Sequence, residues 1–211
     1  MHISNDAPDD VTGANESIDR RAYYLFALLW LAVLISFIDK TIISLLLAAI
    51  QADLRLSDSQ LGILAGAAFG VTYMVGALTN STFADRTNRT RLIGAMVIVW
   101  SMATLACGIA HGFVMLVLCR AVVGFAEGGL NPTSASLIGD TFPRRHRAGA
   151  LALLSSAVGA GIMVTFVVGG PLVHWLGTIP RLVLPLVGEI APWQGAFVVA
   201  GLPGVVVGVL L

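Results

Sequence analysis

Long apolar stretches alternate with short polar breaks along almost the whole chain. A membrane-spanning α-helix needs about 20 predominantly apolar residues, and six stretches are close to that length. They cover approximately residues 22–50, 60–84, 92–110, 112–138, 148–173 and 193–211. The pattern therefore predicts six transmembrane helices, which makes the fold class an all-α, polytopic membrane helix bundle.

The composition agrees with this prediction. The sequence is 57% hydrophobic and 11% charged, whereas a soluble globular domain is about 45–50% apolar and about 25% charged. Its 23 glycines fit closely packed membrane helices, because small residues let two backbones approach. A soluble domain is therefore excluded.

Residues 1–21 are polar and acidic, and we expect a disordered cytoplasmic tail there. They do not resemble a signal peptide, because the basic start and the short apolar core are absent. Residues 22–211 then form one six-span unit.

Basic residues in short loops indicate the orientation, because cytoplasmic loops carry an excess of Lys and Arg. With the amino terminus inside, the inner segments carry Arg20, Arg21, Arg86, Arg89, Arg91, Arg144, Arg145 and Arg147. The outer segments carry only Arg55 and Arg181. We expect a multi-pass protein of the cell (inner) membrane with a cytoplasmic amino terminus.

Two of the predicted spans contain charged residues well away from their ends. A charge at the centre of a span costs about 2.5–3.5 kcal/mol on insertion scales, so such residues usually serve a function. At 1.5 Å per residue, Asp39 lies roughly 24 Å from the inner end of its span and Arg120 roughly 10 Å from the outer end of its own. These depths allow an interaction between the two. Lys40 is about 100° around the helix from Asp39 and is expected to face elsewhere.

Arg120, Glu127 and Asn131 lie on one face of the fourth span, with Gly124 expected to leave open space between the first two. This polar stripe suits proton coupling and substrate binding. The alternative is a permanent internal ion pair that only fixes helix packing. Pro132 removes a hydrogen bond to the carbonyl of Gly128 and can end or kink this helix.

Two further patterns concern packing. Gly62, Gly66 and Gly70 recur at four-residue spacing, which predicts a smooth groove for a neighbouring helix. Cys107 and Cys119 flank one tight turn, so a disulfide is possible, although buried thiols are commoner in this setting.

A dense charged loop, residues 81–91, separates the second and third spans. It contains Asp85, Arg86, Arg89 and Arg91. It is either a solvated cytoplasmic turn or a gating motif of a transporter.

The ordered motifs resemble the amino-terminal half of a major facilitator superfamily transporter, over about residues 22–211. The family pattern Gly-x-x-x-Asp-Arg-x-Gly-Arg-x-Arg matches the charged loop, with Ser81 and Asn88 at the glycine positions. Asn tolerates a left-handed turn and can replace Gly there. The other matching features are Arg120-x-x-x-Gly124-x-x-Glu127, Asp39 followed by Gln51–Leu54 and Leu56–Gly62, and Trp193-Gln194-x-x-Phe197 followed by Gly201–Gly204.

Within the superfamily, the chain looks most like the spinster-like branch. The resemblance implies half of a twelve-helix fold and secondary transport of a small organic solute, anionic or amphipathic, coupled to protons. It assigns proton coupling and substrate binding to Asp39, Arg120 and Glu127. Asn131 extends the face of Arg120 and Glu127 by one helical turn and is included in the candidate site. It also implies that Asp85 and the loop arginines hold the cytoplasmic gate against the second half. Without that half, Asp85 is expected to be satisfied locally.

Other classes are considered beside this one. A membrane serine protease is disfavoured, because no Gly-x-Ser-Gly turn with a partner histidine is present. A truncated, non-transporting fragment, or a half that needs a carboxy-terminal half or a second copy, remains the alternative. The expected partners are the solute, protons and the lipid bilayer. No enzyme activity, cofactor, metal site or nucleic-acid partner is expected.

Overall fold

The structure is a computed structural model that describes residues 19–84, 86–179, 182–184 and 188–211. Six of its helical segments are long and apolar enough to cross a membrane, so all six predicted spans are confirmed. The helices that cross as single α-helices are α1 (Arg20–Leu54), α4 (Arg89–Cys107) and α9 (Pro192–Leu210).

The second, fourth and fifth spans are interrupted. The second consists of α2 (Asp58–Gly62), the π-helix η1 (Ile63–Ala67) and α3 (Ala68–Ala84). The fourth consists of α5 (Phe113–Gly128) and α6 (Leu130–Thr141), and the fifth of α7 (Arg144–Val164), η2 (Thr165–Gly169) and α8 (Gly170–Gly177). The predicted break at Pro132 is confirmed, because α5 ends at Gly128, whose carbonyl cannot accept from the missing N–H of Pro132.

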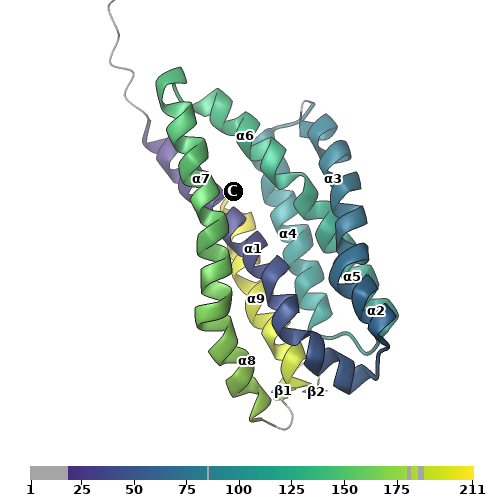
Figure 1. The fold of residues 1–211 in the computed structure, drawn as a ribbon. Coiled ribbons are helices and arrows are strands. Elements are labelled where there is room, and N and C mark those ends of the chain that lie inside the picture. Colours follow the sequence, from purple (N-terminus) through teal and green to yellow (C-terminus); the bar gives the residue numbers. More distant parts are fainter. Residues whose placement is uncertain (1–18, 85, 180–181, 185–187) are drawn as a thin grey trace, which may run out of the picture.

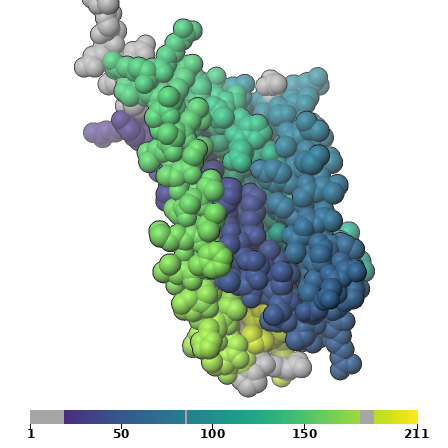
Figure 2. Space-filling view, viewed as in Figure 1, coloured from purple at the N-terminus to yellow at the C-terminus, as the bar shows by residue number. Residues whose placement is uncertain are grey.

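The helices form one bundle (Figure 1). α1 packs on α7 and α9, α3 packs on α5, and α4 packs on both α5 and α9. Figure 2 shows α1 lying between α7–α8 on one side and α2–α3 on the other. A disordered tail was predicted for residues 1–21, of which residues 1–18 lie outside the described part of the chain. Residues 20 and 21 already belong to α1.

Polar contacts close one end of the bundle. Trp193 Nε1 donates to Asp53 Oδ2 at 2.8 Å, which joins the start of α9 to the end of α1. Gln194 Nε2 donates to the carbonyl of Ala110 at 2.9 Å and ties α9 to the α4–α5 turn. The loop before α9 contains a short antiparallel pair, β1 (Leu182–Leu184) and β2 (Gly188–Ile190), which the sequence pattern did not predict.

Gly124 does not leave open space, so that expectation was wrong. A Cβ atom there would overlap the backbone carbonyl of Phe69, and one at Gly128 would overlap the carbonyl of Tyr73. The two glycines let α5 press against the backbone of α3. The cysteines Cys107 and Cys119 are free.

The predicted packing groove of Gly62, Gly66 and Gly70 has no neighbour in the described part of the chain. An added Cβ atom at any of the three would meet no described atom within 4 Å. The same side of α3 exposes large apolar side chains such as Met74 and Leu78, which are 68% and 72% exposed. This surface therefore faces outward from the six-span unit.

The two sets of glycines predict different responses to substitution. Gly124→Ala should lower the free energy of unfolding by about 1–3 kcal/mol, because the new methyl group overpacks the α3–α5 contact. Gly70→Ala, on the open face of the same helix pair, should change it by less than about 0.5 kcal/mol. Thermal or denaturant unfolding in detergent micelles measures both. Equal effects would contradict the close contact at Gly124.

Candidate functional site

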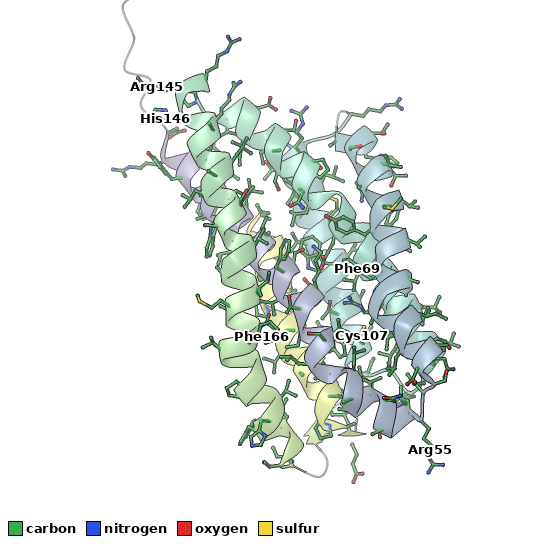
Figure 3. The ribbon with its side chains drawn as sticks, viewed as in Figure 1. Arg55, Phe69, Cys107, Arg145, His146 and Phe166 are labelled. Carbon is green, nitrogen blue, oxygen red and sulfur yellow. The ribbon has the colours of Figure 1, made fainter. Side chains whose placement is uncertain are left out.

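The charged residues within the spans meet near the middle of the bundle. Asp39 and Lys40 come from α1, and Arg120 and Glu127 come from α5. Asp39, Arg120 and Glu127 are 1–2% exposed. Figure 3 shows the labelled Phe69 ring at this level, between α1 and α3. The fold thus brings together the three charged residues that the sequence singled out and adds Lys40 to them.

Asp39 points toward α4. Thr104 Oγ1 donates to Asp39 Oδ2 at 3.0 Å, and both residues are buried. The expected contact with Arg120 reaches the backbone instead, because Arg120 Nη1 lies 3.5 Å from the carbonyl oxygen of Asp39. The arginine therefore lies beside the aspartate without a direct hydrogen bond to its carboxylate among the contacts of the described residues.

Glu127 is held by α1 rather than by Arg120. Lys40 Nζ lies 2.8 Å from Glu127 Oε2, and Ser36 Oγ donates to the same oxygen at 2.8 Å. Lys40 Nζ also donates to Ser36 Oγ at 2.6 Å. Ser36 and Lys40 are one helical turn apart and therefore share a face. Asp39 and Lys40 contact different helices, α4 and α5, but Lys40 still joins the charged network, so the expectation that it faces elsewhere was wrong.

Aromatic rings surround the two cations. Lys40 Nζ lies 4.6 Å from the centre of the Phe37 ring, 5.1 Å from that of Tyr73 and 5.8 Å from that of Phe69. The Arg120 guanidinium lies 4.9 Å from the Phe69 ring, which stacks on Tyr73. Rings at these distances attract a cation through their negative faces.

Sequence reasoning missed several members of this site. Ser36, Lys40 and Thr104 supply the hydrogen bonds and the ion pair, and Phe69 and Tyr73 supply the rings. The four-residue spacing of Ser36 and Lys40, and that of Phe69 and Tyr73, was a usable signal, because it places each pair on one helix face.

The polar stripe on the fourth span is divided. Arg120 and Glu127 are buried, whereas Asn131 is exposed and lies beyond the break between α5 and α6. Asn131 Nδ2 donates to the Tyr73 hydroxyl at 3.3 Å. Asn131 is thus linked to the charges through the Tyr73 ring.

The network contains two formal positive and two formal negative charges. Its buried atoms Asp39 Oδ1, Glu127 Oε1 and Arg120 Nε have no hydrogen-bond partner among the described residues. Buried polar groups are nearly always paired, so each exception calls for an explanation such as a functional role. The Lys40 side chain is 20% exposed and that of Glu127 is 0% exposed. Lys40 is therefore the most exposed member of the network.

The arginine-rich loop begins α4. Because Asn88 replaces a glycine of the family pattern, a left-handed conformation was expected for it. Its backbone is instead extended, with φ −67° and ψ 112°. Its Oδ1 accepts from the N–H of Arg91 at 3.2 Å, so Asn88 is the N-cap of α4. Arg89 pairs with Asp140 of α6, while Arg86 and Arg91 are exposed. Asp85 lies outside the described residues, so the expectation that it pairs locally stays a prediction.

No group of three or more His, Cys, Asp or Glu side chains that could hold a metal ion is found among the described residues. The chemistry that this arrangement offers is the binding of protons and of charged groups by Asp39, Lys40, Arg120 and Glu127.

The sequence profile of the Major Facilitator Superfamily matches residues 29–211. The chain belongs to this family.

Among curated relatives, the chain is 29% identical to the probable sphingolipid transporter spinster homolog 2 of Arabidopsis thaliana over 150 residues, which cover 71% of this chain and 28% of that protein. It is 26% identical to an MFS-type efflux pump of Mycolicibacterium smegmatis, covering 96% of this chain and 44% of the pump. It is 29% identical to the hexuronate transporter of Bacillus subtilis, covering 74% and 36%. The chain thus spans less than half the length of these relatives.

Solved structures agree. A bacterial homolog to the human lysosomal transporter Spinster, inward-facing and unoccupied, superimposes with a TM-score of 0.80 at 30% identity, covering 92% of this chain and 43% of that one. The proton:xylose symporter XylE, at 14% identity and a TM-score of 0.74, shows the same fold. The chain is an amino-terminal, half-length unit of this transporter fold, and spinster homologues are among its similar proteins.

The Lys40–Glu127 pair predicts a coupled effect on stability. Lys40→Met should cost about 3 kcal/mol, because it leaves the Glu127 carboxylate buried without its counter-ion. The double variant Lys40→Met/Glu127→Leu should recover at least half of that loss. Unfolding free energies in micelles give both values, and a single-variant loss below about 0.5 kcal/mol would contradict the buried pair.

Proposed function

We propose that the chain forms the amino-terminal half of a proton-coupled secondary transporter for a small organic solute, anionic or amphipathic. The observation that carries this proposal is the buried network of Asp39, Lys40, Arg120 and Glu127. Intramembrane charges are costly and generally mark substrate or ion pathways. Membership of a transporter family supports the same conclusion.

Asp39 and Glu127 are the proposed proton carriers. Each has one buried oxygen without a hydrogen-bond partner among the described residues, Oδ1 and Oε1 respectively. A proton added to either oxygen neutralises a carboxylate in a medium that disfavours charge. Protonation of Glu127 weakens its attraction for Lys40 and releases that ammonium from the ion pair.

Arg120 and Lys40 are the proposed binding groups for a negatively charged part of the solute. Both cations lie against the Phe69 ring, and Lys40 also contacts Tyr73. Apolar and aromatic walls with a few placed charges are typical of small-molecule sites. A solute anion that pairs with Lys40 leaves the Glu127 carboxylate without its counter-ion and so favours protonation of that carboxylate. Solute binding and proton binding are thereby coupled.

The solute class is supported by the relatives. Their names refer to sphingolipids, hexuronate and L-galactonate, which are amphipathic or acidic molecules. A site with two cations accommodates the carboxylate of a sugar acid such as hexuronate or L-galactonate.

The proposed solute path lies between this unit and a second six-span half. Transporters of this family consist of two such halves, with the site at their interface. The second half belongs to the same polypeptide or to a second copy. The uncovered face of Gly62, Gly66 and Gly70 is a suitable contact surface for it.

The proposed orientation places the arginine-bearing end in the cytoplasm of a cell (inner) membrane, following the excess of arginine there. The cytoplasmic gate motif that we propose is Asp85, Arg86, Arg89 and Arg91, as the family resemblance implies. The Arg89–Asp140 pair, which joins the start of α4 to the end of α6, supports a role in holding that gate.

Asp39→Asn and Glu127→Gln in the full-length protein should each lower proton-coupled solute flux roughly tenfold or more, equivalent to about 1.4 kcal/mol. The carboxamides keep the shape of the side chains but cannot carry a proton. Flux is measured in proteoliposomes with an imposed pH gradient.

Asp53→Asn is the matched control, because Asp53 lies on the same helix and its carboxamide oxygen still accepts from Trp193. It should leave flux within twofold, roughly 0.4 kcal/mol. Unchanged flux in both Asp39→Asn and Glu127→Gln would overturn the proton-coupled proposal.

A second prediction concerns the gate. Arg89→Gln and Asp140→Asn should each change the unfolding free energy by less than about 1 kcal/mol, because the pair is partly exposed, with side chains 28% and 60% accessible. The same variants should alter the ratio of inward-open to outward-open protein. This ratio is measured by the accessibility of a cysteine placed on the face of Gly62, Gly66 and Gly70. An unaltered ratio would contradict the gating role.

A further inference from the structure

A separate pocket lies at the arginine-bearing end of the bundle, away from the charged network. It has a volume of about 290 Å³ and lies between the start of α1 and the start of α7. Figure 3 shows the labelled Arg145 and His146 at the start of α7. We propose that this pocket binds an anionic phospholipid, with the headgroup phosphate at Arg145 and His146 and the first acyl carbons on the apolar walls.

The walls of the pocket are formed by aromatic and aliphatic side chains. Tyr23 and Phe26, one turn apart on α1, form one side, and Leu153 of α7 forms the other. Phe142 forms the floor; it is 7% exposed and meets Phe26 edge to face with ring centres 5.9 Å apart. Arg147 Nε donates to the carbonyl of Phe142 at 2.9 Å and fixes this floor in place.

The mouth of the pocket is positively charged. Arg145 Nε donates to His146 Nδ1 at 3.4 Å, which places both side chains together, and Arg144 precedes them on the same turn. The first turn of α7 contains no acidic residue, and no side chain of the described residues caps its N–H groups. Those N–H groups add partial positive charge where a phosphate would lie.

A lipid fits this combination better than a soluble anion does. A free phosphate would use the arginine and histidine but not the aromatic walls. Tyr23 and Leu153 are each 57% exposed, so the apolar surface continues outward from the pocket along the lipid-facing side. Basic pockets between membrane helices at the membrane surface are suited to anionic headgroups, and aromatic residues favour the same depth.

Binding at this position would join the first and fifth spans at their arginine-bearing ends. The inference depends only on the membrane location of the chain. It does not depend on transport, so failure of one proposal leaves the other standing.

The experiment is native mass spectrometry of the full-length protein, delipidated and then supplied with equal amounts of phosphatidylglycerol and phosphatidylcholine. The expected result is preferential retention of phosphatidylglycerol. Arg144→Gln/Arg145→Gln should reduce that preference about fivefold or more, since each basic residue near a headgroup contributes about 1 kcal/mol.

Gly149→Leu tests the walls independently of charge. Gly149 lines the pocket, and a Cβ atom there would meet no described atom within 4 Å, so the substitution should fill the pocket without disturbing the fold. It should also lower phosphatidylglycerol retention. Arg91→Gln, which removes one charge at the same end but outside the pocket, is the control and should not.

Three results would overturn the proposal. The first is equal retention of the two lipids by the unmodified protein. The second is full retention by Gly149→Leu, which would mean diffuse electrostatic attraction only. The third is displacement of phosphatidylglycerol by an equal concentration of glycerol 3-phosphate, which would identify a soluble phosphate as the ligand.

Discussion

The ion pair between Lys40 and Glu127 is the contact on which the centre of this bundle depends. Each charge alone would cost several kcal/mol inside a bilayer, so the two residues must stay together or be neutralised. Ser36 binds both, and the aromatic rings of Phe37, Phe69 and Tyr73 cover the ammonium. The first and fourth spans are therefore tied together by electrostatics at a depth where helix association gains little from hydrophobicity.

Close backbone packing makes this arrangement possible. Gly124 and Gly128 let α5 approach α3 closely enough for Phe69 and Tyr73 to reach the cations from the neighbouring helix. The break after Gly128 then redirects α6 toward the other end of the bundle, where Asp140 meets Arg89. The fourth span therefore takes part both in the close packing beside the site, through α5, and in the Arg89–Asp140 ion pair at the end of the bundle, through α6. The open glycine face of α2–α3, by contrast, meets nothing in the described part of the chain.

Much of the candidate site could be predicted because charges in apolar spans are conspicuous. Asp39, Arg120 and Glu127 were identified for that reason and from the family resemblance, and the approximate depths of Asp39 and Arg120 allowed those two residues to meet. Their partners could not be predicted in the same way. The length of the Lys40 side chain and the rotation of α1 decide that Glu127 pairs with Lys40 rather than with Arg120. Likewise, Asn88 was expected to be left-handed, but the start of α4 uses it as an N-cap.

The six spans, the break near Pro132 and the end of the bundle at which arginine gathers could all be read from the amino-acid pattern. These features follow from helix length, the missing N–H of proline and the cost of burying charge, all of which are local properties. The packing of the helices was needed to show that Gly124 is a contact rather than a gap, that Thr104 donates to Asp39, and that Phe69 lies beside both cations. Those facts depend on how four helices, α1, α3, α4 and α5, are rotated against one another, and no periodicity in a single helix specifies that rotation.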